Sequence, residues 1–188
     1  PFAMIENFTL ARAIWMTFLE ICLVALAILS MKLFNWQPTI GTFALYVLFS
    51  LLWYKAIRGV INGNAVIVVA LLIALSLWSI RENRDALGGI LLALMTIKPH
   101  VVLLYIVFVF LWALSKRRWK LIGWTIGSLI VLILAGMVFI PDWLMQNLQE
   151  VLRYPGYNPA GTAGAALQEI LPRVGDYLSI GLTFVVAL

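Results

Sequence analysis

The residues with the clearest chemical potential are Lys98-Pro99-His100, which lie between two apolar runs. Proline has no amide hydrogen and disfavours helical geometry in the residue before it, so two helices are predicted here instead of one. Lys98 and the chain's single histidine then lie at the tip of a hydrophobic hairpin, where they need a polar partner. An anion would suit both. Lys98 could neutralise a lipid phosphate, while His100 could donate a hydrogen bond to it or to a sugar hydroxyl.

Other bases could join this anion site, and plainer interpretations exist for all of them. Arg58, together with Lys55, could add positive charge, although two bases at a helix end are more often interfacial anchors. Lys98 could also extend to the membrane surface as an anchor. His100 could hydrogen-bond a neighbouring carbonyl instead of a ligand.

The only long polar segment covers residues 141–176. Its beginning predicts a helix over 143–153 whose single apolar face suits the membrane interface. Tyr154, Tyr157 and Asn158 follow, in a loop rich in glycine and proline. Tyrosine offers a flat apolar face and a hydroxyl, so these residues could form a sugar-binding lip or could equally serve as interfacial aromatics.

The composition predicts a membrane protein of several spans. Hydrophobic residues make up 64% of the chain and charged residues 11%, whereas about a quarter of residues are charged in soluble proteins. The mean hydropathy is +1.04. The apolar runs predict one all-α transmembrane bundle, with about seven spans by the usual length criterion: 11–33, 39–57, 65–80, 86–97, 101–114, 121–140 and 177–188.

The span over 86–97 is too short to cross a bilayer alone, so the Lys98 tip is predicted to lie in a recess below the surface. The basic segment Ser115 to Lys120 is predicted to be cytoplasmic. Alternating spans then place the Lys98 tip and the segment 141–176 outside. Gly123 and Gly127 form a small-residue pair that predicts close helix packing.

Several classes of function are disfavoured. One cysteine, Cys22, and one histidine make a transition-metal site improbable, and the sequence contains no cofactor-binding motif. The formal charge of +5 is scattered between apolar spans, so anionic lipid is a better expected partner than nucleic acid.

The chain resembles glycosyltransferase family 87. The resemblance is carried by the glycine-rich run Ala86 to Leu94, followed by Ile97-Lys98-Pro99-His100 and by an apolar run that ends in Lys116-Arg117-Arg118-Trp119. Asn62-Gly63-Asn64 is similar to the family's glycine-glutamine turn, with asparagine in place of glutamine. On this resemblance the sequence is expected to be an internal piece of a longer protein.

The resemblance implies a GT-C-like fold in a bacterial-type plasma (inner) membrane. It implies transfer of a sugar, of the mannose or pentose class, from a polyprenyl-phosphate donor on the extracytoplasmic face, without a metal or cofactor. Lys98 matches the family's lysine, and the family's catalytic acid is expected upstream of Pro1. Two other classes remain open at this point, namely a non-catalytic subunit of a larger membrane complex and a transporter. A transporter is the weaker alternative because only one broken helix is evident.

Overall fold

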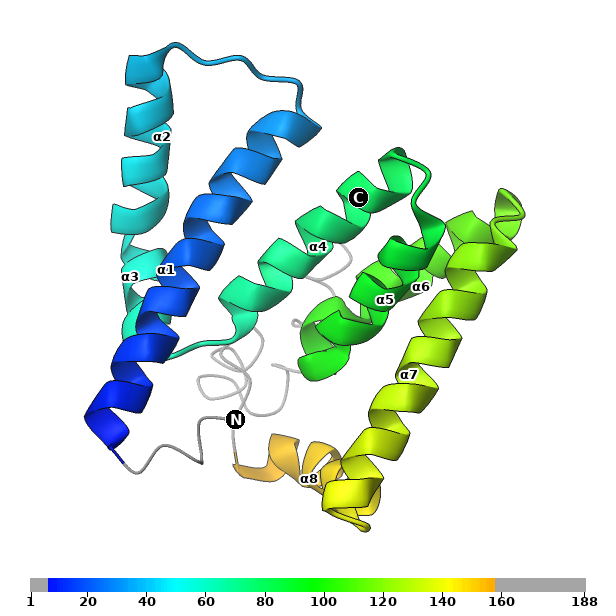
Figure 1. The fold of residues 1–188 in the computed structure, drawn as a ribbon. Coiled ribbons are helices and arrows are strands. Elements are labelled where there is room, and N and C mark those ends of the chain that lie inside the picture. Colours follow the sequence, from blue (N-terminus) through cyan, green and yellow to red (C-terminus); the bar gives the residue numbers. More distant parts are fainter. Residues whose placement is uncertain (1–6, 158–188) are drawn as a thin grey trace, which may run out of the picture. The chain divides into compact units, whose positions relative to one another are not determined.

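The computed structural model describes residues 7–157, and these residues form helices joined by turns, with no strand among them (Figure 1). The expectation of an all-α membrane protein is therefore confirmed. The elements are α1 (Phe8–Leu33), α2 (Ile40–Leu52), α3 (Tyr54–Ile61), α4 (Val66–Arg81), α5 (Asp85–Leu94), the 3-10 helix η2 (Met95–Ile97), α6 (Pro99–Ser115), α7 (Trp119–Phe139) and α8 (Trp143–Tyr157).

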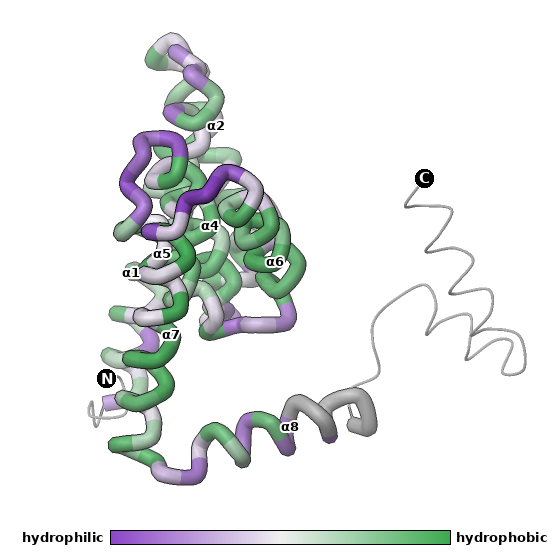
Figure 2. The backbone as a smooth tube through the Cα atoms, turned by 90° about the vertical axis from the view of Figure 1, so that its right-hand side faces the viewer, coloured by the Kyte–Doolittle hydropathy of each residue, from purple (hydrophilic) through white to green (hydrophobic). Residues whose placement is uncertain are grey.

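The chain divides into two compact units, residues 1–132 and 133–188, and the boundary falls within α7. In the first unit, hydrophilic residues are concentrated at the turns while the helices between them are hydrophobic (Figure 2). In the second unit, the indole Nε1 of Trp143 donates a hydrogen bond to the carbonyl of Ile133 at 3.4 Å. Gly136 lies against the same indole, so Trp143 fastens the start of α8 to the end of α7.

Within residues 7–157, two helices, α1 and α7, are long and apolar enough to cross a membrane by length and composition. The pair α2 and α3 would count as a third span if taken together, although a bend of 50° separates them. The helices α4, α5 with η2, and α6 are shorter. The seventh expected span and most of the segment 141–176 lie outside the described residues.

The apolar run over 39–57 was expected to be one helix, yet the structure divides it at Trp53. This residue has extended backbone angles, with φ −57° and ψ 130°, between α2 and α3. The two helices differ in what they can bury. None of the residues of α2 is buried, whereas α3 buries Val60 in a cluster with Leu19 and Ile67, from α1 and α4. The bend lets α3 reach this cluster while its bases stay exposed.

A second cluster joins α4, α5, α6 and α7. Here Gly89 on α5 faces the backbone of α7, and an added Cβ would lie 2.7 Å from the carbonyl oxygen of Leu121 and 2.8 Å from the amide nitrogen of Thr125. The glycine-rich run therefore serves close packing between helices. The pair predicted for this purpose, Gly123 and Gly127, has no such contact within residues 7–157, since nothing there lies within 4 Å of a Cβ at either position.

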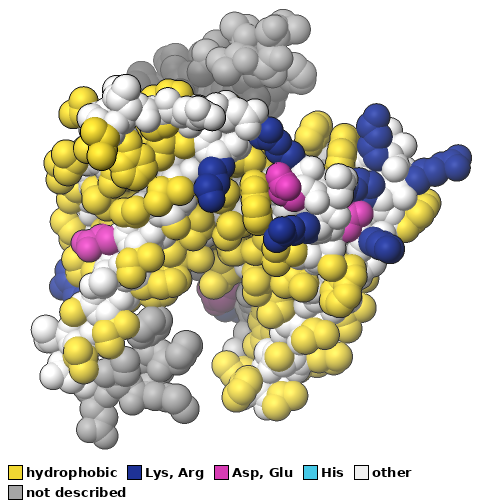
Figure 3. All heavy atoms as spheres, turned by 45° about the horizontal axis from the view of Figure 1, so that its top comes forward, with side chains coloured by type: hydrophobic (Ala, Val, Ile, Leu, Met, Phe, Trp, Pro, Cys, Tyr) yellow, Lys and Arg dark blue, Asp and Glu magenta, His cyan; other side chains and the backbone are white. Residues whose placement is uncertain are grey.

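One end of this unit is strongly basic (Figure 3). Arg118, in the α6–α7 turn, reaches across to the α4–α5 turn. It pairs there with Asp85 at 2.5 Å, with both side chains 16% exposed. It also donates to the carbonyl of Ile80 at 2.9 Å and to the side chain of Asn83 at 3.2 Å. This network ties the two turns together at the end that carries most of the cations.

Candidate functional site

The break predicted at Lys98-Pro99 is present. Helix α5 ends at Leu94, and η2 continues the chain to Ile97. Lys98 then adopts a non-helical conformation, with φ −131° and ψ 77°. Pro99 opens α6 at its first position, where a missing amide hydrogen costs no intrahelical hydrogen bond.

Lys98 contacts a polar turn far away in the sequence. Its Nζ donates a hydrogen bond to Oδ1 of Asn64 at 2.7 Å. The same oxygen accepts the backbone amide of Val66 at 3.1 Å, so the asparagine is already fixed at the start of α4. Asn64 takes up one of the N–H donors of the ammonium, and no other residue within 7–157 bonds to the remaining donors, which can serve a ligand.

The turn that supplies Asn64 is itself held by α1. Nε1 of Trp15 donates to the carbonyl of Gly63 at 3.0 Å. Gly63 has a φ of +62°, a left-handed conformation that favours glycine, and a Cβ there would lie 3.2 Å from the indole. The sequence Asn62-Gly63-Asn64 thus forms the tight turn that was predicted, and Trp15 fixes its position.

The turn also lies beside the first turns of α1. Phe8, Arg12 and Trp15 line a hollow of about 510 Å³ together with Asn62 and Gly63. Arg12 therefore places a second base, besides Lys98, next to the turn.

The other predicted anion-binding residues are less closely assembled. His100 is exposed on the first turn of α6, and none of the described residues forms a hydrogen bond or ion pair with its ring. Arg58 is at the end of α3, just before the turn, but its Nη1 donates to the hydroxyl of Tyr54 at 3.3 Å. The Nζ of Lys55 lies 5.7 Å from the centre of the Tyr54 ring. The structure thus joins Lys98 to the turn directly and leaves Arg58 one helical turn away.

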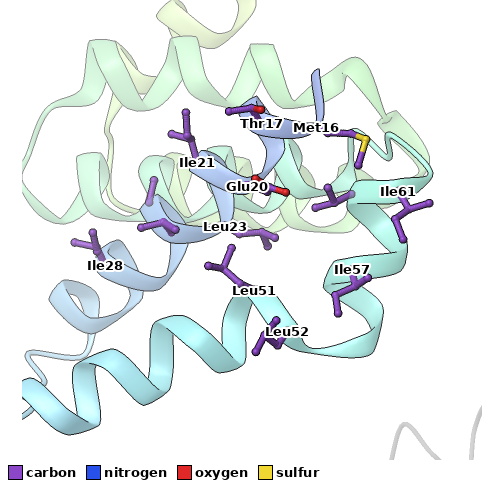
Figure 4. Close-up of a pocket in the computed structure, with 13 residues that line it drawn as sticks. Met16, Thr17, Glu20, Ile21, Leu23, Ile28, Leu51, Leu52, Ile57 and Ile61 are labelled. Carbon is purple, nitrogen blue, oxygen red and sulfur yellow. The ribbon is translucent and has the colours of Figure 1, made fainter. Parts of the chain in front are cut away.

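An apolar groove of about 810 Å³ begins beside this turn and continues between α1 and the bent pair α2 and α3 (Figure 4). Val60 and Ile61 line its end next to the turn, and Ile28 lines the far end. Glu20 is the only charged residue in its lining. Figure 4 shows the Glu20 side chain among the apolar side chains that face the groove.

The residues of the proposed sugar-binding lip are differently placed from the expectation. Helix α8 continues to Tyr157, so Tyr154 and Tyr157 belong to a helix and not to a loop. The residue Asn158 lies outside the described residues. The helix predicted over 143–153 is present and continues four residues further, to Tyr157, with Pro155 inside its last turn.

Sequence reasoning missed the partners of the tip. Asn64 was recognised only as part of the Asn62-Gly63-Asn64 turn, and no contact was predicted for Trp15. Their contacts with Lys98 and Gly63 join residues 34 and 48 positions apart. The order of the helices could have predicted the Lys98–Asn64 contact, because antiparallel neighbours bring the end of α5 and the start of α4 to the same end of the bundle.

Comparison with known proteins gives one result. No curated protein and no solved structure matches the chain. The family model described as glycosyltransferase family 87 matches residues 1–188, the full sequence. With a family match over its whole length, and with the Lys-Pro break and glycine-rich helix in place, this membrane protein belongs to glycosyltransferase family 87.

Proposed function

We propose that the protein transfers a sugar of the mannose or pentose class from a polyprenyl-phosphate donor to an acceptor on the extracytoplasmic face of a bacterial-type plasma membrane. The donor phosphate binds at the Lys98 tip. The observation that carries this proposal is the Lys98 ammonium, which among the described residues is hydrogen-bonded to the neutral side-chain oxygen of Asn64 and keeps further N–H donors for a ligand. Family membership supports a glycosyltransferase in general, and the site suggests the kind of donor.

The chemistry requires positive charge at this point. When the bond between the anomeric carbon and the phosphate oxygen breaks, the electron pair leaves with the lipid phosphate, and a positioned cation stabilises the developing charge. Lys98 supplies that cation. Arg12, beside the turn, and Arg58, at the end of α3, add to the field, while His100 is placed to donate to phosphate or sugar. A carboxylate outside the described residues would take the proton of the acceptor hydroxyl.

The shape of the surroundings supports a lipid-linked donor. The apolar groove starts at Ile61, next to the turn, and reaches Ile28 along α1. Thr17 to Ile28 alone covers about 16 Å at 1.5 Å per residue, enough to hold several isoprene units. A prenyl chain in this groove would bring its phosphate to the cations beside the turn.

The distribution of charge supports the orientation. Seven bases lie at the end opposite the Lys98 tip, among residues 32–120: Lys32, Arg81, Arg84, Lys116, Arg117, Arg118 and Lys120. Only Glu82 and Asp85 accompany them. Because short basic loops stay in the cytoplasm, this end is assigned to the cytoplasmic side and the Lys98 tip to the outer side.

The test is release of polyprenyl phosphate from a polyprenyl-phosphate sugar by the full-length protein in nanodiscs. Removing one electrostatic stabiliser typically costs a factor of about 100 to 1,000 in kcat, so Lys98→Ala should lower turnover by at least about 100-fold. Lys32→Ala removes a base at the opposite end and serves as the matched control, with turnover expected to stay near that of the wild type. Thermal unfolding checks that both variants are folded.

Two results would contradict the proposal. If Lys98→Ala turned over the donor as fast as the wild type does, Lys98 would be an interfacial anchor and not a phosphate contact. Failure to turn over any polyprenyl-phosphate sugar, together with purification in a stoichiometric membrane complex, would favour a structural subunit.

A further inference from the structure

A second apolar groove, of about 670 Å³, lies between α5 and α7 within the first unit. Ile90 and Leu94 form its α5 side, and Gly123 and Gly127 form the floor on α7. Lys120 is the only charged residue in the lining, and it lies in the first turn of α7, at the strongly basic end. No acidic side chain among residues 7–157 forms an ion pair with Lys120.

We propose that this groove binds one phospholipid with an anionic headgroup, whose phosphate contacts Lys120 and whose acyl chain lies along the glycine floor. The proposal goes beyond the sugar transfer proposed above, because the groove opens from the basic end of the unit and the Lys98 tip lies at the other end. It concerns a lipid that is retained and not consumed.

The dimensions fit a lipid of a single leaflet. The lining on α7 extends from Lys120 to Leu132, about 18 Å at 1.5 Å per residue. One leaflet contributes roughly 15 Å of hydrocarbon to a bilayer. A lipid anchored at Lys120 would therefore fill the groove to about the middle of the membrane, which is where the lining ends.

The charges select the headgroup. Lys116 and Arg117, in the α6–α7 turn just before Lys120, are exposed. The two acids at this end are Asp85, which is paired with Arg118, and Glu82, which does not line the groove. Anionic lipids are attracted to such juxtamembrane bases. A zwitterionic headgroup carries its own positive charge, which these bases would repel, so its binding is disfavoured.

The open floor is formed by the absence of side chains. A Cβ at Gly123 or Gly127 would meet nothing within 4 Å, so these glycines do not serve contact with any described helix. Trp124, which is 51% exposed, forms one wall and offers a flat surface to an acyl chain.

The experiment measures phospholipid that remains bound when the full-length protein is released from nanodiscs made of equal amounts of phosphatidylglycerol and phosphatidylcholine. Native mass spectrometry counts the bound lipids. Lys120→Gln should lower phosphatidylglycerol retention about five-fold, the equivalent of about 1 kcal/mol per base near an anionic surface. Gly127→Leu should reduce it to the phosphatidylcholine level, because the side chain occupies the groove.

Two control variants separate a site from a general attraction. Lys32→Gln removes a base at the same end that does not line this groove, and Gly41→Leu adds the same side chain at another open glycine. Both should retain phosphatidylglycerol as the wild type does. Equal retention in all variants would show that the retained lipid does not bind in this groove, and equal loss in Lys32→Gln and Lys120→Gln would show only diffuse attraction. Either result would overturn the proposal, and neither bears on turnover at Lys98.

Discussion

Replacing single glycines by alanine should reveal where the helices of the first unit touch, since the effect on stability changes sign with position. Gly89→Ala places a Cβ 2.7 Å from both the carbonyl oxygen of Leu121 and Cβ of Trp124. Ordinary contact begins at 3.4 Å, so α5 and α7 must separate by about 0.7 Å in a tightly packed interior. Backbone atoms of α7 cannot rotate away as a side chain can.

The size of the effect follows from two opposing contributions. Overpacking costs about 1–3 kcal/mol, and alanine in place of a helical glycine returns about 0.5–1 kcal/mol. The free energy of unfolding of Gly89→Ala should therefore fall by about 1–2 kcal/mol, which for a domain of this size lowers the melting temperature by about 2–8 °C.

Two neighbouring substitutions provide the comparison. At Gly88 an added Cβ meets only side-chain atoms, the nearest being Cδ1 of Leu121 at 3.1 Å and Cγ1 of Ile80 at 3.3 Å, so the change should be close to zero. At Gly123 none of the described residues lies within 4 Å, and Gly123→Ala should raise the free energy of unfolding by about 0.5–1 kcal/mol through helix propensity alone.

Thermal unfolding of the full-length protein in mild detergent, monitored by the fraction that remains monodisperse after heating, gives the three melting temperatures. The reasoning requires the order Gly89→Ala below Gly88→Ala below Gly123→Ala. If Gly89→Ala is as stable as the wild type, α5 and α7 do not meet at this glycine. If Gly123→Ala is destabilised, another helix packs on the face that the described residues leave open.

Three further substitutions test other contacts. Arg118→Leu leaves the carboxylate of Asp85 largely buried without its partner, so the melting temperature should fall by about 6–20 °C for a loss of about 3–5 kcal/mol, and the additional change Asp85→Leu should restore most of it. Gly136→Ala should push the Trp143 indole from its place and speed amide hydrogen exchange in α8, while exchange in the first unit stays unchanged. Trp15→Phe removes the hydrogen bond that fixes the α3–α4 turn, and it should weaken donor binding measurably while lowering stability by only about 1 kcal/mol.

Local features of the site could be predicted from the sequence because they depend on backbone chemistry alone. Pro99 restricts its own φ and that of Lys98, which requires a break at this position. Gly63 in an asparagine-glycine pair predicts a tight turn, and its φ of +62° agrees. Neither prediction needs knowledge of a residue elsewhere in the chain.

Features that depend on packing could not be predicted in this way. The division at Trp53 has no proline or glycine to signal it, and it follows from the different surfaces that α2 and α3 can bury. The same limit applies to the glycines. Gly123 and Gly127 have the spacing of a packing motif, yet Gly88 and Gly89 make the close contact, because only the neighbouring helix decides which face is covered.

The two ends of the first unit show why the same kind of charge carries a structural role at one end and a proposed ligand-binding role at the other. Arg118 is mostly buried, paired with Asp85, and uses most of its N–H donors on atoms of the protein, so little remains for a ligand. Lys98 has Asn64, a neutral acceptor, as its partner. Its charge is therefore oriented without being neutralised. A cation held in this manner, close to an apolar groove, is suited to receive a lipid phosphate, and this is why the proposed donor site belongs at the less basic end of the unit.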